Sequence, residues 1–327
     1  MLAHPHQDTD EYFYNVSSDW FKFKYEVIKV PPATNTASPF SGTEIVGEVP
    51  FSFTGPAYFH SFGMTENFFI LIENPLVVKK FWKMLVMNFM KYSYLDVLKW
   101  RPELKSRMHL IDRKSGVVAK TYLVENFFAF HHVNAYEEGS NLIVDVCGYP
   151  DASVIQAFYL HNLRSGLKHF KYKGPALRRY RLPTPESGSR CENPVPLPIN
   201  SDGSEFEVIL EGFELPRINY AYNTKKYKFA YGTVFRDNNF FLENIAKVNL
   251  ETKATIPWIE EHCFPSEPVF IPSPGATEED DGIVLSAVVG VLEKPSFLLF
   301  LDGKTFTEIA RAVVPGRLAL TFHGLFL

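Results

Sequence analysis

The stretch AKVNLETKATIPWIE, residues 246–260, has two apolar strand-like runs joined by an Asn and a polar turn that contains Lys. The same phrase recurs in MHLIDRKSGVVAKTYLV, which starts at Met108, and in LLFLDGKTFTEIARAVV, which starts at Leu298. The turn residues Asn249 and Asp302 lie 53 positions apart, and a four-stranded propeller blade takes about 40–50 residues. The repeat therefore favours an all-β protein built as a β-propeller, with a β-sandwich as the alternative.

Strand signals also dominate the rest of the chain. Short runs rich in β-branched and aromatic residues are bounded by Pro, Gly, Asn and Asp. The predicted strands are Phe21–Val30, Asn67–Ile72, Asn141–Cys147, Phe206–Leu210, Tyr227–Tyr231, Gly282–Val291 and Phe297–Leu301. An exposed loop is predicted for Pro183–Pro198, where Pro, Ser and Gly follow one another closely.

Residues 75–100 break the β pattern. From Pro75 to Trp100 the sequence predicts a helix in which Phe, Trp and Met side chains stand among lysines. Such a helix can pack against a face of the propeller. Alternatively, it can lie at a membrane interface, with its aromatic residues in the bilayer and its lysines at the headgroups.

The composition excludes two broad classes of protein. Of the 327 residues, 46% are hydrophobic and 21% are charged, which is not the composition of a disordered chain. The net charge is −4, so no basic field would attract nucleic acid, and we expect no such partner. Three cysteines, an odd number, predict a reducing, cytoplasmic location rather than a disulfide framework. The 30 Phe residues predict large apolar surfaces in a core, a ligand tunnel or both.

Four of the ten histidines lie in conspicuous settings. His4 is in Ala-His-Pro-His, and His60, His131 and His323 each follow an apolar or aromatic run. The inner strands of successive propeller blades point at one axis, so histidines far apart in the sequence can converge there. Their wide spacing excludes a helical HExxH site and a zinc finger, but does not by itself establish a metal site. We interpret the following as structural or surface residues: His109, His161, His169 and His262.

Six motifs carry a resemblance to a known family. They are AHPH at 3–6, YFHSFGMTEN at 58–67, FHHVNAYEE at 130–138, FELPRINY at 213–220, PSEPVFIPSPGATEEDDGIVLS at 265–286 and FHGLF at 322–326. In this order they resemble the carotenoid cleavage oxygenases, which include the animal β-carotene oxygenases and the retinoid isomerohydrolase of the visual cycle. The resemblance implies a seven-bladed β-propeller with Fe(II) on its axis, held by four histidines.

The resemblance also implies roles for individual residues. By motif match the iron ligands are His4, His60, His131 and His323, whereas the neighbouring histidines 6 and 132 are not ligands. Behind them we expect two carboxylates that hydrogen-bond to ligating imidazoles, and not merely solvated surface residues. These carboxylates are Glu214 and Glu267. The aromatic residues that correspond to the lining of a substrate tunnel are Tyr58, Phe130 and Tyr149, with a purely structural core role as the alternative.

Several stretches are most similar to the β-carotene 15,15'-dioxygenase branch, among them DVCGYPD at 145–151 and EGFELPRINYAYN at 211–223. The isomerohydrolase branch usually has Trp where Tyr149 stands. We therefore expect a dioxygenase that uses Fe(II) and O2 to cleave a carotenoid double bond into aldehydes, with retinal as the product of a central cut. The alternatives are eccentric 9',10' cleavage to apocarotenals, retinyl-ester isomerohydrolysis, and a non-catalytic carotenoid-binding protein or inactive fragment.

Two expectations concern the extent of the domain and its surroundings. We expect residues 1–327 to form one carotenoid oxygenase domain with helical insertions on the iron-facing side. The family pattern continues upstream of AHPH, where it supplies early blades and a third carboxylate, so the chain reads as N-terminally truncated and its propeller as incomplete. Because carotenoids partition into membranes, we also expect a cytoplasmic protein that touches a membrane through residues 75–100.

Overall fold

The computed structural model of the protein consists almost entirely of β-sheet. It describes residues 2–8, 11–32, 40–53, 55–78, 94–165, 172–235, 244–316, 318–319 and 321–326. The first sheet contains β1 (His6–Gln7), β2 (Phe13–Asp19), β3 (Lys24–Val30) and β4 (Glu44–Pro50). The second has the order β14 (Val195–Pro196), β10 (Val118–Val124), β9 (Ser106–Asp112), β6 (Phe68–Glu73) and β5 (Gly63–Met64).

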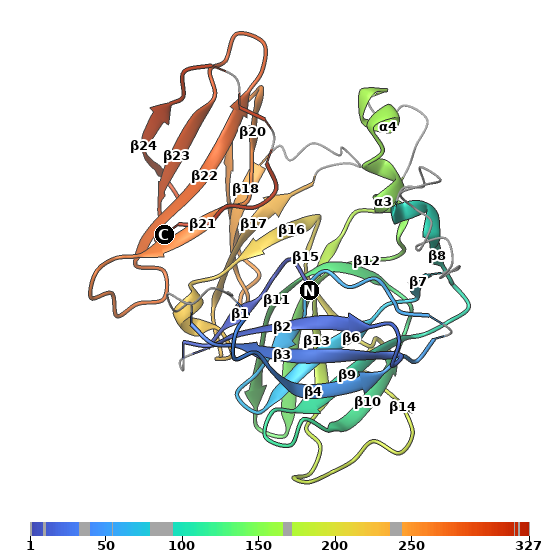
Figure 1. Ribbon diagram of the computed structural model, residues 1–327. Helices are drawn as coiled ribbons and strands as arrows, with labels where there is room; N and C mark the ends of the chain where they lie inside the picture. Colours follow the sequence, from blue (N-terminus) through green and yellow to red (C-terminus); the bar gives the residue numbers. More distant parts are fainter. Residues whose placement is uncertain are drawn as a thin grey trace.

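Three further sheets of the same kind follow along the chain. The third contains β11 (Phe128–Glu138), β12 (Asn141–Tyr149), β13 (Ala176–Pro183) and β15 (Glu207–Glu211). The fourth contains β16 (Phe213–Arg217), β17 (Phe229–Val234), β18 (Asn244–Asn249) and β19 (Thr255–Ile259). The fifth contains β20 (Cys263–Pro265), β22 (Gly282–Gly290), β23 (Phe297–Asp302) and β24 (Glu308–Val313), and β21 (Val269–Pro272) pairs with β22. Successive sheets lie beside one another around the N-terminal segment (Figure 1), the arrangement of propeller blades.

The three repeated strand–turn–strand phrases are hairpins, as predicted. They form the pairs β9–β10, β18–β19 and β23–β24. The side chain of Asp112, Asn249 or Asp302 accepts hydrogen bonds from backbone N–H groups two or three residues on, which closes the turn locally. The residue four positions later has a positive φ in every case: Gly116, Lys253 and Phe306. Identical turn chemistry thus produces the repeat.

The predicted strands are present, with shifts at their ends. One shift concerns Phe21–Val30, because β3 begins only at Lys24. The carboxylate of Asp19 accepts the N–H groups of Phe21 and Lys22 and closes a turn there. Phe23 has a φ of 55°, which lies far from the φ of a regular strand. The turn leaves Phe21 90% exposed and Phe23 65% exposed.

The prediction of a helix from Pro75 to Trp100 is wrong at both described ends. Leu76–Val78 forms strand β7 and Leu98–Trp100 forms strand β8, and the two pair as an antiparallel ribbon. A 3-10 turn, η1 (Tyr94–Val97), precedes β8. The β-branched Val77 and Val78 suit a strand, and pairing with β8 satisfies their backbone groups. The middle of the predicted helix, residues 79–93, lies outside the described residues.

Short helices interrupt the sheets in places that the sequence did not predict. They are α3 (Ser153–Ala157) and α4 (Leu160–Arg164), which follow β12, and η2 (Tyr220–Tyr222), which follows β16. No helix of the described part is long and apolar enough to cross a membrane.

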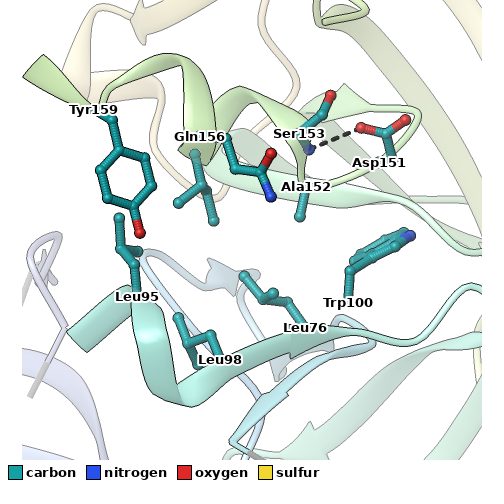
Figure 2. A pocket seen from close by; sticks show the side chains of 10 residues that line it. Leu76, Leu95, Leu98, Trp100, Asp151, Ala152, Ser153, Gln156 and Tyr159 are labelled. Carbon is teal, nitrogen blue, oxygen red and sulfur yellow. Dashed lines mark hydrogen bonds between the residues drawn. The ribbon is translucent and has the colours of Figure 1, made fainter. Parts of the chain in front are cut away.

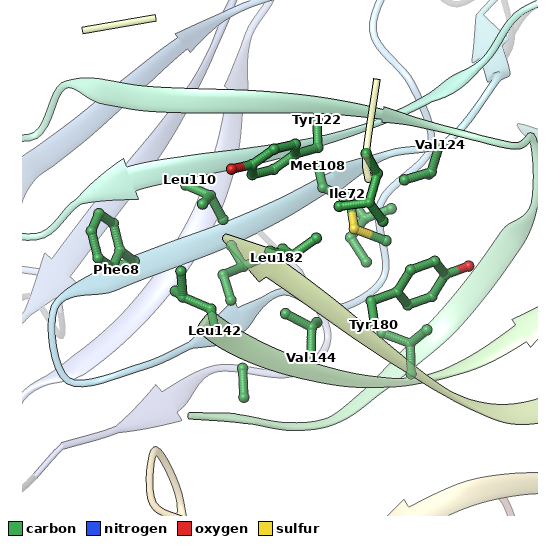
Figure 3. Close-up of a cluster of buried hydrophobic side chains, with 14 of the residues drawn as sticks. Phe68, Ile72, Met108, Leu110, Tyr122, Val124, Leu142, Val144, Tyr180 and Leu182 are labelled. Atoms are coloured by element: carbon green, nitrogen blue, oxygen red, sulfur yellow. The ribbon is translucent and has the colours of Figure 1, made fainter. Parts of the chain in front are cut away.

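Apolar side chains between neighbouring sheets form the core. Figure 3 shows one such cluster, in which Phe68, Met108 and Leu110 of the second sheet face Leu142 and Val144 of the third. Each such buried aliphatic or aromatic side chain stabilises the fold by about 1.5–3 kcal/mol relative to an exposed one. The core therefore holds the blades face to face.

Carboxylates add hydrogen bonds between the blades. Glu137 on β11 accepts bonds from Thr65 Oγ1, at 2.7 Å, and from both the backbone and the side chain of Asn67, at 2.9 Å. Glu279, in the loop before β22, accepts the backbone N–H groups of Lys228 and Phe229 in the same way. These bonds connect the third sheet to the second and the fifth sheet to the fourth.

Candidate metal centre

Four imidazoles from distant parts of the chain meet where the sheets converge. His4 precedes β1, His60 precedes β5, His131 lies in β11, and His323 lies in the C-terminal segment. The ring centroid of His4 is 4.9 Å from that of His60, 4.8 Å from that of His131 and 4.6 Å from that of His323. One ring nitrogen from each residue lies within 4.8 Å of the others. Nitrogens bound to one metal ion at about 2.1 Å are at most about 4.2 Å apart, so a small contraction would close this set.

The surroundings favour the neutral form of two of these imidazoles, those of His4 and His60. Burial, followed by the neighbouring imidazoles, lowers the pKa of His4 to about 2 and that of His60 to about 3. A neutral imidazole offers a nitrogen lone pair to a metal. Nε2 of His4 and Nε2 of His131 are buried and have no hydrogen-bond partner. Two unpartnered nitrogens in a four-imidazole cluster are the arrangement that a bound metal would satisfy.

A buried carboxylate orients His131. Glu214, which is 2% exposed on β16, lies with Oε2 2.6 Å from Nδ1 of His131. The same oxygen accepts the N–H of Leu215, which has a φ of 47° at an irregularity in β16. With Nδ1–H donated to Glu214, Nε2 of His131 is left as an acceptor that faces the other imidazoles.

A second carboxylate and an arginine hold His323. Oε1 of Glu267 lies 3.0 Å from Nδ1 of His323, and Oε2 accepts the N–H of Gly324. Burial works to raise the pKa of Glu267, but the hydrogen bond from His323 and the charge of Arg217 leave it below its usual value. Arg217 also donates to the carbonyl of Gly324, at 2.6 Å. Both backbone groups of Gly324 are therefore held, although no strand includes it.

Arg217 is a site residue that the sequence did not identify. Its position in FELPRINY, three residues after Glu214, is the only available signal, since an Arg in an apolar motif usually pairs with a carboxylate. His60 also has a partner that was not expected. Its Nδ1 lies 3.1 Å from the hydroxyl of Tyr58, a residue predicted only as a tunnel aromatic.

The three predicted tunnel aromatics lie together beside the imidazoles. The Phe130 ring is 5.4 Å from that of His60, 6.3 Å from that of Tyr58 and 5.9 Å from that of Tyr149. Tyr149 is fully buried, and its burial together with the nearby Glu214 carboxylate raises the pKa of its phenol well above the usual range. Further aromatics that the sequence did not identify extend this layer: Phe128, Phe158 and Phe322.

A cavity of about 290 Å³ adjoins the aromatic layer. Figure 2 shows Ala152 and Gln156, from the α3 region, facing Leu98 and Trp100 of the β8 region across it. Ala152 and Trp100 belong to the same apolar cluster as Tyr58, Phe130 and Tyr149. Residues that line the cavity therefore pack in one cluster with the aromatic residues next to the imidazoles.

The two neighbouring histidines have other partners. Nε2 of His6 donates to the carbonyl of Phe62, 2.9 Å away, and Nδ1 of His132 lies 2.8 Å from the hydroxyl of Ser61. Among the histidines interpreted as structural, His109 is buried between Glu73 and Thr121. His169 lies outside the described residues.

The model of the family described as retinal pigment epithelial membrane protein matches residues 1–327. The chain belongs to this carotenoid oxygenase family. It is 35% identical over 350 residues to the beta,beta-carotene 15,15'-dioxygenase of Homo sapiens, and it is also 35% identical to a mitochondrial carotenoid-cleaving dioxygenase of Macaca fascicularis. Either alignment covers 99% of this chain and 64% of the relative, so the chain spans about two thirds of their length.

Comparison with solved structures shows that this chain has the fold of the carotenoid oxygenase propellers. A cobalt-substituted apocarotenoid oxygenase of Synechocystis superposes with a TM-score of 0.73 at 20% identity. The superposition covers 99% of this chain and 64% of that one. A chimera of the apocarotenoid oxygenase and the retinal pigment epithelial protein gives the same TM-score. The predicted all-β propeller fold of the carotenoid oxygenase type is thereby confirmed.

Proposed function

We propose that the protein is an Fe(II)-dependent dioxygenase that cleaves a double bond of a carotenoid with O2 into two aldehydes. The observation that carries this proposal is the cluster of four imidazoles, two of them hydrogen-bonded to buried carboxylates. Imidazole nitrogen suits divalent iron, and four such ligands leave two octahedral positions open. A bound Fe(II) would supply the means to activate dioxygen at these open positions.

The side chains of the protein would prepare the centre for that metal. Glu214 and Glu267 hold the Nδ1 protons of His131 and His323, so that Nε2 of each ring is presented as a ligand. The hydroxyl of Tyr58 forms a hydrogen bond with Nδ1 of His60 and so would orient that ring as well. Hydrogen-bonded partners of this kind typically affect metal affinity by about 10–100-fold.

The aromatic layer fits the proposed substrate. A polyene hydrocarbon offers nothing polar by which it can be oriented, so shape and apolar contact must position it. Phe130 and Tyr149 supply such surfaces within one or two side chains of the imidazoles. Central cleavage is favoured because the relatives include enzymes named for the 15,15' bond. Eccentric cleavage is the alternative position, because tunnel depth decides which bond is cut, and retinyl-ester isomerohydrolysis is the alternative reaction.

The dioxygenase and a non-catalytic carotenoid carrier can be distinguished with one sample. Purified protein loaded anaerobically with Fe(II) is mixed with β-carotene and air, and retinal is measured by chromatography. We expect retinal in amounts that exceed the iron present. Bound pigment without aldehyde would favour the carrier, and neither pigment nor aldehyde would contradict both.

Replacement of Glu267 by Gln is expected to weaken metal binding about 10–100-fold. The amide cannot accept from both His323 and Arg217 as the carboxylate does, so His323 loses its fixed orientation. The affinity for Fe(II) or Co(II), measured by titration, tests this. Glu308→Gln, at an ion pair with Arg311 remote from the site, serves as the control. Equal affinity of the two variants would contradict the role of Glu267.

We also propose a cytoplasmic protein with peripheral membrane contact. The segment expected to make this contact, residues 75–100, is described only at its ends. Phe21 and Phe23 lie at the same end of the molecule as the described ends of this segment. The carbonyl of Phe23 accepts the N–H of Phe51, and five residues later the carbonyl of Pro56 accepts the N–H of Val78 in β7. Two exposed Phe residues on either side of Lys22 are typical of a turn that inserts at a membrane interface.

The double substitution Phe21→Asp and Phe23→Asp is therefore expected to reduce binding to vesicles at least about tenfold. Flotation with vesicles of neutral and anionic phospholipids measures the bound fraction. A matched control is Ile256→Asp with Ile259→Asp, which changes two exposed apolar residues of β19. Equal binding of both double variants would contradict membrane contact through the turn.

A further inference from the structure

Strand β11 is irregular at the residue that carries a central imidazole. Its register against β12 shifts between Ala129 and His132 and again between His132 and Asn134. In this fully described part of the sheet, neither Phe130 nor His131 has a partner residue on β12. The backbone around His131 must therefore be held by something other than the strand ladder.

A single hydroxyl takes over this task. Oγ of Ser61 donates to the carbonyl of Phe130, at 2.7 Å, and accepts the backbone N–H of His132, at 2.8 Å. The same oxygen lies 2.8 Å from Nδ1 of His132. A hydroxyl has one proton and two lone pairs, so these three bonds use its full capacity if His132 carries its proton on Nδ1. Ser61 is 7% exposed, so little solvent is available to replace these bonds.

The position of Ser61 in the chain connects two of the four histidines. Ser61 directly follows His60, and the two backbone groups it binds lie on either side of His131. One oxygen atom thus ties the segment of one central imidazole to the segment of another. The two segments run very close together, since a Cβ on Gly63 would lie 3.2 Å from the His132 ring.

We propose that Ser61 is a positioning residue of the metal centre, whose hydroxyl sets the distance between His60 and His131. The inference rests on the proposed function, because it assumes that the imidazoles bind a metal. It assigns Ser61 a part different from that of Glu214: the carboxylate fixes the rotation of the His131 ring, and Ser61 fixes the backbone from which that ring projects.

Replacement of Ser61 by Ala tests the proposal with Co(II), whose absorption spectrum in the visible range reports the geometry of its ligands. We expect the affinity of the protein for Co(II) to fall at least about tenfold and the spectrum of the bound ion to shift. The matched control is Thr65→Ala. Thr65 is buried in the same segment, and its hydroxyl donates to Glu137 and accepts the N–H of Phe68. This control loses stability but keeps the affinity and the spectrum.

A second substitution distinguishes the effect of losing the hydroxyl from a general disturbance of the fold. Ser61→Thr keeps the hydroxyl, and we expect it to restore the affinity for Co(II) to within about threefold of the unaltered protein. If Ser61→Ala does not fold, Ser61→Cys, with a weaker and longer donor, takes its place, and we expect a reduced affinity and a shifted spectrum. Wild-type affinity and spectrum in Ser61→Ala or Ser61→Cys, or an equal loss of affinity in Thr65→Ala, would overturn the proposal. Unaltered protein that binds no Co(II) would instead overturn the metal centre itself.

Discussion

Replacement of His131 by Ala is expected to reduce the iron content of the reconstituted protein from about one ion per chain to less than about a tenth of that. His131 is the most deeply buried of the four imidazoles, at 6% exposure, and its ring lies within 5.1 Å of those of His4, His60 and His323. Without it, three candidate ligands remain, and Glu214 loses the imidazole to which it is hydrogen-bonded.

Iron is measured by elemental analysis after anaerobic loading and gel filtration. His262→Ala is a suitable control because His262 is exposed and its recorded ion-pair partner is the surface residue Glu261. The retinal assay should lose its signal in parallel with the iron. Normal iron content in His131→Ala would refute the proposed ligand set.

The largest expected effect on stability comes from a buried ion pair between β12 and β13. Arg179 on β13 donates two hydrogen bonds to Asp145 on β12, at 2.9 and 2.8 Å, and Tyr227 donates a third, at 2.7 Å. Asp145 is fully buried and Arg179 is 8% exposed. Replacement of Asp145 by Ala leaves a guanidinium and a phenol without their acceptor, which should lower the free energy of unfolding by about 3–5 kcal/mol.

Unfolding in urea, followed by circular dichroism, measures this loss. Tyr227→Phe removes one neutral donor, and we expect it to cost only about 0.5–1.5 kcal/mol. The double variant Asp145→Leu with Arg179→Met leaves no unpaired charge and should recover much of the loss. A cost for Asp145→Ala no greater than that for Tyr227→Phe would show that the pair is not desolvated as the structure indicates.

The fold was predictable where the interactions that form it are local. Asp112, Asn249 and Asp302 each close their turn through N–H groups two or three residues away, so the hairpin repeat can be recognised in the sequence itself. Strands such as Phe297–Asp302 alternate buried and half-buried residues and could be identified in the same way. The region from Pro75 to Trp100 could not, because β7 and β8 stabilise each other across residues that show no strand pattern.

In the candidate site, too, some residues could be predicted from the sequence and others could not. Sequence motifs identified the four histidines and the two glutamates, since each stands in a stretch whose residue types resemble those of the family. Arg217 was missed because its partners, Glu267 and Gly324, lie far away in the sequence. The hydroxyl of Tyr58 was assigned to a tunnel wall, and the structure shows that it also contacts His60.

By itself, the sequence determined the strand-rich architecture and the hairpin repeat, because short-range periodicity and turn chemistry encode these features. The candidate metal ligands came from motifs that resemble those of the family. Only the tertiary structure decided how those residues meet. His4 and His323 stand at opposite ends of the chain, yet their rings are 4.6 Å apart. The break in the register of β11 and the hydroxyl of Ser61 that spans it depend on contacts between strands about 70 residues apart. Such contacts form only when the sheets pack, and no local pattern records them.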